Sequence, residues 1–316
     1  MFPKTTRKSW RAALLTAAVL VGTTVAASPA TAAPFDLAGW ATQGGGTTGG
    51  GSASPVTVTT AAAFTTAAKS TSPAVIRVSG TITLSDMTKV AANKTIIGVG
   101  STATITGSGL NVANASNVII RNLNFRDWDD DAINVQYSTR VWIDHNSFSN
   151  GYDGAVDVKR ASDYVTVSWN KFSSHDKTML LGHDDGNGSE DSGHLRVTYH
   201  HNWFNGTNQR HPRVRFGNPV HVYNNYYGGV TSYGVASTKD AGVLVEGNYF
   251  ENTKDPFHRG EGSSPAANLV AKNNYFVNSG AGSAGGTVKA IPYSYTLDAA
   301  SGVKASVTSG AGTGKI

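Results

Sequence analysis

The 316-residue sequence contains no cysteine, so disulfides cannot stabilise its fold. If residues 1–32 are a leader, as argued below, the remaining 284 residues are still enough chain to bury a hydrophobic core without crosslinks. The 36 glycines and a charged fraction of only 15% indicate many turns and short strands rather than long helices.

No long apolar run occurs after residue 32, and the run before it has the flanks of a secretory signal. Four basic residues come first: Lys4, Arg7, Lys8 and Arg11. The apolar run, 12–27, is short for a bilayer span, and Ala30-Thr31-Ala32 offers a small-x-small cleavage site. The alternative is an N-terminal membrane anchor. We predict a signal peptide over 1–32 and a single secreted, extracellular domain over 33–316, with no membrane contact after cleavage.

The mature chain has little net charge. The whole sequence carries +5, but four of its basic residues lie in the leader, which has no acidic residue, so the mature chain carries +1. This balance argues against a general nucleic-acid-binding protein, and we expect no nucleic-acid partner. Any preference for a polyanion must come from local clusters of charge.

A motif of about nine residues recurs from residue 117 onward, ending in an aromatic side chain. These aromatic residues stand 23 to 32 positions apart: Phe125, Phe148, Phe172, Phe204, Tyr227, Phe250 and Phe276. Two positions before the last six stand Asn146, Asn170, Asn202, Asn225, Asn248 and Asn274. Each motif is an alternating, β-branched stretch bounded by Gly, Asn, Asp and Ser, which predicts a short strand.

A fixed period of this length indicates a stacked array. It is too short for a four-stranded propeller blade, and no helical periodicity separates the strands. The sequence therefore predicts an all-β protein, a parallel β-helix with one coil per repeat. The asparagines should form a hydrogen-bonded ladder along the stack, and the aromatic rings should stack in or against the core. We interpret both ladders as structural.

Segments outside the repeat fit the ends of such a solenoid. Ala61–Lys69 is predicted to be a short helix that caps the N-terminal end. Gly44–Gly51 has the composition of a flexible linker. The last stretch, Tyr293–Ile316, lacks the repeat and is expected to be an irregular segment packed along the outside.

Ionisable residues follow the terminal aromatics of four successive coils at nearly the same offset. Asp131 lies 6 residues after Phe125 and Arg210 lies 6 after Phe204; the coils between carry Asp153 and Lys177, each 5 residues after its aromatic. Because adjacent strands lie about 4.8 Å apart, these residues are predicted to form a column on one face.

The acidic half of this column has the spacing of a metal site. Two carboxylate oxygens that face each other across a calcium ion lie about 5 Å apart, which suits Asp131 and Asp153 on neighbouring coils. Asp157 and Asp129 could complete the shell, and all-oxygen ligation favours calcium or magnesium. The alternative is a solvated acidic turn. The basic half, Lys177 with the segment Arg210–Arg215, would suit a chain of carboxylates.

The chain resembles the pectate lyases of polysaccharide lyase family 1 over essentially its whole mature length. The resemblance rests on Val141-Trp-Ile-Asp-His145, Asp153-Gly-Ala-Val-Asp157, Val165-Thr-Val-Ser-Trp-Asn170, His175-Asp-Lys177, Arg210-His-Pro-Arg-Val-Arg215 and the glycine-rich run Gly44–Gly50. It implies a right-handed single-stranded parallel β-helix and a calcium-dependent pectate lyase. Such an enzyme cleaves de-esterified homogalacturonan (polygalacturonate) by β-elimination to 4,5-unsaturated oligogalacturonides. We expect the protein to be a monomer.

The resemblance also assigns roles to residues. Asp131, Asp153 and Asp157 correspond to the primary calcium ligands, and Asp129 to an accessory one. Lys177 and Arg215 correspond to substrate-binding residues, and Arg210 to the catalytic base. An arginine is a difficult base, because neutralising one with an ordinary pKa of about 12.5 at pH 9 costs about 5 kcal/mol. Lys177 is chemically the easier base, so this assignment stays open.

Three other functions remain open at this stage. A pectin lyase on the same fold would act on methyl-esterified polymer, although a neutral substrate gives a metal no carboxylate to bridge. A galacturonan hydrolase would use paired carboxylates, for which Asp129 and Asp131 are candidates, but the stacked Lys and Arg would then lack a role. A non-catalytic polysaccharide-binding β-helix would need the ladders without the charged column.

Overall fold

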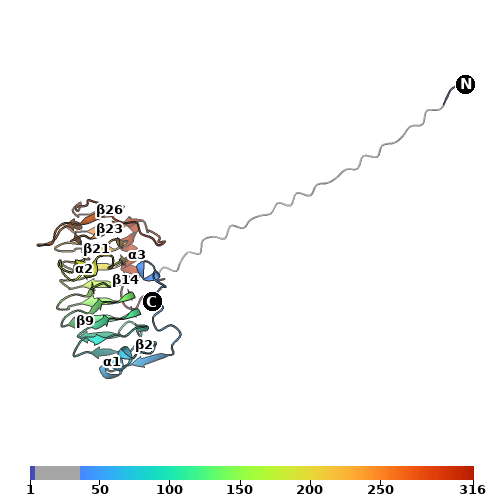
Figure 1. Cartoon of the computed structure of the whole chain (residues 1–316). Coiled ribbons are helices and arrows are strands. Elements are labelled where there is room, and N and C mark those ends of the chain that lie inside the picture. Colours follow the sequence, from blue (N-terminus) through green and yellow to red (C-terminus); the bar gives the residue numbers. More distant parts are fainter. Residues whose placement is uncertain (4–35) are drawn as a thin grey trace. The chain divides into compact units, whose positions relative to one another are not determined.

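The computed structural model describes residues 1–3 and 36–316, so the predicted signal peptide lies almost entirely outside the described residues. Residues 36–316 form a parallel β-helix, which confirms the predicted fold. Its coils stack from the helix α1 at one end to the strand β26 at the other (Figure 1). No helix within the described residues has both the length and the apolar character needed to cross a membrane.

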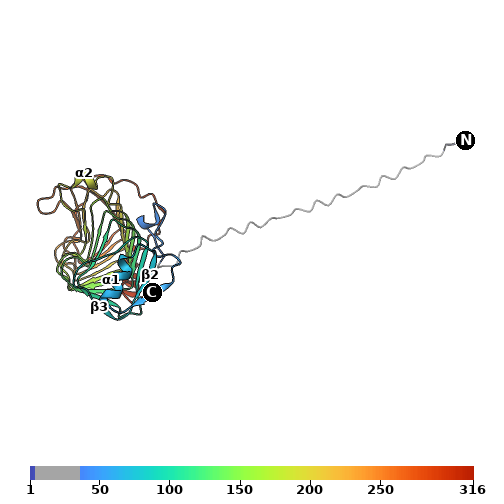
Figure 2. The same ribbon diagram turned by 60° about the horizontal axis from the view of Figure 1, so that its bottom comes forward.

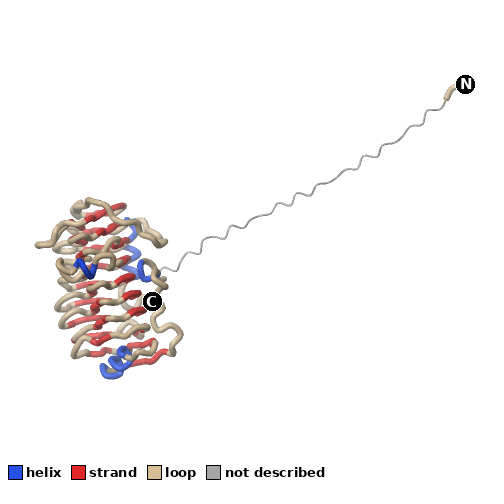
Figure 3. Tube along the Cα trace, viewed as in Figure 1, coloured by secondary structure: helices blue, strands red, loops and turns tan. Residues whose placement is uncertain are grey.

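Each coil contributes strands to three parallel sheets, here called sheets A, B and C in the order in which the chain visits them (Figure 3). Sheet A holds β1 Pro55–Val58, β2 Ala74–Val78, β5 Lys94–Gly98, β8 Ser116–Arg121, β11 Thr139–Asp144, β14 Asp163–Ser168, β17 Val197–His200, β20 Val220–Tyr223, β23 Gly242–Glu246 and β26 Asn268–Lys272. Sheet B holds β3 Thr81–Thr83, β6 Thr104–Gly107, β9 Asn124–Trp128, β12 Ser147–Ser149, β15 Lys171–Ser173, β18 Trp203–Asn205, β21 Tyr226–Gly228, β24 Tyr249–Glu251 and β27 Tyr275–Val277. Sheet C holds β4 Thr88–Lys89, β7 Leu110–Ala113, β10 Ile133–Gln136, β13 Val156–Lys159, β16 Leu180–Leu181, β19 Arg213–Arg215, β22 Val235–Thr238 and β25 Phe257–Arg259.

The repeated motif spans two strands rather than the single strand that its alternation suggested. Its first part lies in sheet A and its terminal aromatic lies in sheet B, as in β11 and β12. The residue before the ladder asparagine takes a left-handed backbone conformation, with φ of 53° at His145, 53° at Trp169 and 54° at His201. This conformation bends the chain from sheet A into sheet B, so the nine-residue motif contains a turn between two strands.

The asparagine and aromatic ladders are confirmed, and both are buried in the stack except in the last coil, where Phe276 is exposed. From Asn146 to Asn248, each side-chain amide donates to the Oδ1 atom of the asparagine in the next coil at 3.0–3.1 Å, and the series ends at Asn274. The aromatic ladder pairs in register, and the ring centroids of successive coils lie 4.4–5.5 Å apart. Buried amides need partners, and each of these five asparagines has one at the same position of the next coil.

The N-terminal cap is confirmed. The helix α1 (Ala61–Lys69) has the predicted bounds and buries Phe64 and Ala68 against the first coils (Figure 2). The Thr60 hydroxyl accepts a hydrogen bond from the Ala63 amide and caps its first turn. The glycine-rich run is not a flexible linker, because a Cβ at Gly49 or Gly50 would lie 2.2 Å from Thr95 Oγ1 or the Ala74 carbonyl oxygen. The run packs directly against sheet A, which only glycine allows.

The C-terminal segment packs along the outside, as expected, but it is not wholly irregular. It contains η2 (Ala300–Gly302) and α3 (Val303–Gly310), whereas the N-terminal segment contains η1 (Trp40–Thr42). Side chains of α3 pack against outward-facing aromatics of the coils: Val303 and Val307 lie in one buried cluster with Trp169, Tyr226 and Tyr249. This outer aromatic surface gives the segment an apolar face to fold on, which the repeat pattern does not reveal.

Candidate active site

The turns that lead from sheet B to sheet C carry the predicted column. Asp131 follows β9, Asp153 follows β12, Lys177 follows β15 and Arg210 follows β18, so four successive coils present them at the same corner. The Asp153 Oδ1 atom lies 3.3 Å from Lys177 Nζ and 3.9 Å from Arg210 Nη1. The structure therefore brings Asp153 together with basic residues that follow it by 24 and 57 positions in the sequence.

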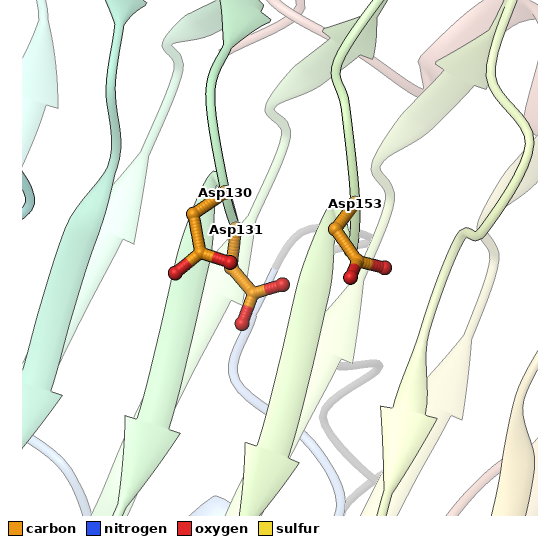
Figure 4. Close-up of side chains that lie close together, drawn as sticks. All are labelled: Asp130, Asp131 and Asp153. Atoms are coloured by element: carbon orange, nitrogen blue, oxygen red, sulfur yellow. The ribbon is translucent and has the colours of Figure 1, made fainter.

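The acidic half is a group of three carboxylates on two adjacent coils. Oxygen atoms of Asp130, Asp131 and Asp153 lie within 4.8 Å of one another (Figure 4). Asp130 was not singled out from the sequence, although it stands five residues after Phe125, the same offset as Asp153 has from Phe148. The Asp153 amide also donates to the Asp130 carbonyl oxygen at 3.0 Å, so these two residues are equivalent positions of neighbouring coils.

Gly154 allows Asp131 and Asp157 to approach each other. A Cβ at this position would lie 2.2 Å from Asp157 Oδ1 and 2.8 Å from Asp131 Oδ1, so both carboxylates lie over the glycine. The Gly154 amide donates to Asp131 Oδ1 at 3.0 Å. The Nζ atom of Lys159 lies 2.8 Å from Asp131 Oδ2 and 3.5 Å from Asp157 Oδ2, and it balances part of their charge.

Asp157 lies on β13 and is buried, with 3% of its surface exposed. Burial is the main cause that raises the pKa of Asp157 to about 7, and repulsion from Asp131 is the second. The Leu180 amide donates to Asp157 Oδ1 at 3.0 Å, which favours the ionised form and opposes part of this rise. Burial also raises the pKa of Asp131. These carboxylates are thus held where ionisation is costly unless a cation compensates them.

We expect the chelator-treated protein to lose stability as the pH rises from 5 to 8. The unfolded chain releases the Asp157 proton near its ordinary value of 3.8, whereas the folded chain keeps that proton up to about pH 7. The folded state therefore binds more protons across this window, and stability falls with pH by roughly 2–4 kcal/mol. Thermal unfolding in a chelator at both pH values measures the effect.

Two comparisons make this pH test specific. Asp157→Asn should flatten the pH dependence, and calcium should restore more stability at pH 8 than at pH 5, because a cation needs the ionised form. An unfolding midpoint that rises between pH 5 and pH 8 in the chelator would contradict the expectation.

The remaining predicted residues are Asp129 and Arg215. Asp129 is exposed, and its part in the site stays a prediction. Arg215 lies on β19, is 9% exposed, and donates from Nε to Asp185 Oδ1 at 2.7 Å. Its partner, Asp185, comes from a loop 30 residues earlier, and no local pattern in the sequence pointed to it.

The acidic group fits a hard divalent cation. Its donors are all carboxylate oxygens, the ligands that calcium and magnesium prefer. The Asp153 Oδ1 atom is shielded from solvent and accepts no hydrogen bond from the residues that the structure describes. Lys177 and Arg210 lie beside the acidic group, so an anion bound to a divalent cation there would also contact these two side chains.

Comparison with known proteins agrees with this geometry. A family model described as pectate lyase matches residues 11–316. The chain is 42% identical over 266 residues to a probable pectate lyase A of Aspergillus flavus, covering 81% of each chain. It is 38% identical over 283 residues to a pectate trisaccharide-lyase of Bacillus licheniformis, covering 83% of this chain and 81% of that one. A pectate lyase from Bacillus sp. N165, solved in complex with trigalacturonate, superposes with a TM-score of 0.81 at 34% identity, over 89% of this chain and 99% of that one.

Proposed function

The chain belongs to the pectate lyase family, whose members are polysaccharide lyases, and from this we propose that it is a calcium-dependent enzyme acting on polygalacturonate. The reaction is β-elimination within de-esterified homogalacturonan, and the products are 4,5-unsaturated oligogalacturonides. The observation that carries the proposal is the contact of opposite charges at one corner: Asp153 lies within ion-pair distance of Lys177 and Arg210.

Asp131, Asp153 and Asp157 are proposed to hold calcium, with Asp129 as an accessory ligand. Asp130 is a further candidate, since its carboxylate lies in the group with Asp131 and Asp153. Bound calcium supplies Lewis-acid polarisation of the uronate carboxylate, which makes the neighbouring C5 proton more acidic.

The basic residues then have separate roles. Lys177 and Arg215 bind the substrate and neutralise negative charge that develops on the uronate carboxylate. Arg210 removes the C5 proton; the C5–H electron pair forms the C4–C5 double bond, and the C4 oxygen leaves with the electrons of its bond and takes up a proton. An arginine must lose its proton before it can act as a base, which leads us to expect an alkaline optimum.

The same geometry weighs against the alternatives. A pectin lyase or a galacturonan hydrolase would have no use for cationic side chains that adjoin a cluster of carboxylates at ion-pair distance. A non-catalytic binding protein would not need carboxylates buried as deeply as Asp131 and Asp157. We propose further that 1–32 directs export and is removed, and that 33–316 acts outside the cell as a monomer.

We expect a calcium-dependent rise in ultraviolet absorbance when the protein is incubated with polygalacturonate, because the unsaturated product absorbs and the substrate does not. A chelator should abolish the rise, and added calcium should restore it. A rise on esterified pectin that survives the chelator would indicate a pectin lyase. New reducing ends without absorbance would indicate a hydrolase, and no cleavage at all would leave only binding.

A further inference from the structure

The longest coil of the repeat carries an inserted loop. Its terminal aromatics, Phe172 and Phe204, stand 32 residues apart, whereas the other intervals are 23 to 26 residues. The additional residues lie between β16 and β17 and include the helix α2 (Gly188–Asp191) at the periphery of the stack (Figures 1 and 2). The loop begins at Gly182, directly after β16, which pairs with β19; a Cβ at Gly182 would lie 2.7 Å from Arg215 Cβ, so the loop starts alongside this arginine.

This loop holds the guanidinium group of Arg215 at two points. Arg215 Nε donates to Asp185 Oδ1 at 2.7 Å, and Nη1 donates to the Gly182 carbonyl oxygen at 3.4 Å. The Arg215 side chain is 11% exposed, and Asp185 is 35% exposed, so the pair is partly shielded from solvent. A charge-assisted hydrogen bond from Nε to a carboxylate fixes the plane of the guanidinium group and leaves Nη2 available for another acceptor.

A second loop fixes Asp185 in turn. Ser264 Oγ donates to Asp185 Oδ1 at 2.8 Å and accepts a hydrogen bond from Arg213 Nη2 at 2.9 Å. Ser264 is buried and lies in a tight turn closed by two backbone hydrogen bonds with Glu261. The chain of contacts therefore joins the inserted loop, the strand β19 and this turn.

We propose that Asp185 is the positioning residue for Arg215, and that the inserted loop serves to orient this arginine toward a uronate carboxylate. This inference rests on the proposed function, in which Arg215 binds the substrate. Asp185 does not touch the substrate; it acts by selecting one orientation of the guanidinium group. Ser264 supports this role because its hydroxyl donates to Asp185 Oδ1, the same oxygen that accepts the hydrogen bond from Arg215 Nε.

The test measures kcat/KM on polygalacturonate and the affinity for trigalacturonate by calorimetry, both with calcium present. Asp185→Ala should lower kcat/KM about tenfold, equivalent to about 1.4 kcal/mol. In an Arg215→Ala background the same change should have no further effect, because the residue acts only through that arginine. Ser264→Ala should give a smaller loss that is likewise absent in the Asp185→Ala background.

Asp184→Ala is the matched control. It removes a negative charge from the adjacent position, where the Asp184 carboxylate lies 3.5 Å from His183 Nε2 and accepts a hydrogen bond from the Gly186 amide. Since removing an anion near a polyanionic substrate favours binding, this variant should match or exceed the wild type, whereas Asp185→Ala should lose activity.

The outcomes separate the two proposals. Wild-type kcat/KM and affinity in Asp185→Ala, or a loss that adds fully to that of Arg215→Ala, would overturn the positioning role. If the wild-type protein binds trigalacturonate without cleaving it, the affinities of the same variants for trigalacturonate test the positioning role of Asp185. A wild-type protein that neither binds nor cleaves would overturn the proposed function, and this inference with it.

Discussion

Arg210→Ala is expected to lower kcat/KM on polygalacturonate by about 10²–10⁴-fold, the usual contribution of a general base. The Arg210 guanidinium group lies 3.9 Å from Asp153, at the junction of the acidic group and the basic residues, where a substrate carboxylate would be held. Its loss removes the proposed proton acceptor while leaving the carboxylates in place. Calcium affinity measured by calorimetry should therefore remain within a few fold of the wild type.

Chemical rescue tests whether the reaction needs a guanidinium group at position 210, and rescue that increases with pH indicates a base rather than a merely cationic neighbour. Guanidinium salts should restore part of the activity of Arg210→Ala and should not affect Arg160→Ala, a control in which the lost side chain pairs with Glu190 outside the site. If Arg210→Lys keeps substantial activity while Lys177→Ala abolishes it, the base is Lys177 and the two roles exchange. Lys177 is placed for this as well, since its Nζ atom lies 3.3 Å from Asp153.

Asp131→Asn and Asp153→Asn are each expected to weaken calcium binding at least about 100-fold. Changes to groups that only support a metal ligand cost 10–100-fold, so removing the charge of a ligand should cost at least as much. Both side chains keep their shape as asparagine, so the loss reflects charge rather than packing. Calorimetric titration with calcium measures the effect, and activity should fall in parallel and recover partly as calcium is raised.

The two neighbouring aspartates provide an internal comparison. Both side chains are exposed, but Asp130 contributes an oxygen to the group of three carboxylates, whereas Asp129 is proposed as an accessory ligand outside that group. Asp130→Asn should therefore weaken calcium binding more than Asp129→Asn does. The exposed Asp240, which pairs with Lys239, is a suitable control, and Asp240→Asn should leave the calcium affinity unchanged. Equal effects of Asp129→Asn and Asp130→Asn would contradict the geometric grouping.

The sequence alone was sufficient to predict the β-helix, its ladders and its N-terminal cap. Each coil repeats one local pattern. The spacing of Asn146, its successors and the aromatics that follow them therefore predicts which residues pair between neighbouring coils. The same periodicity identified Asp153, Lys177 and Arg210 as neighbours, because residues at equal offsets in successive coils must lie one strand spacing apart. In a repeat protein, the spacing of residues along the chain therefore predicts which of them are neighbours in the fold.

Tertiary structure decided whatever the repeat does not encode. An offset gives the height of a residue in the stack but not the direction of its side chain, so the sequence did not show that the Asp157 carboxylate meets that of Asp131 over Gly154. The fold of α3 depends on an outer aromatic surface that exists only after the coils have stacked. The partnership of Arg215 with Asp185 depends on a loop that departs from the period. Contacts between segments without a common register arise from packing alone, and only the folded chain reveals them.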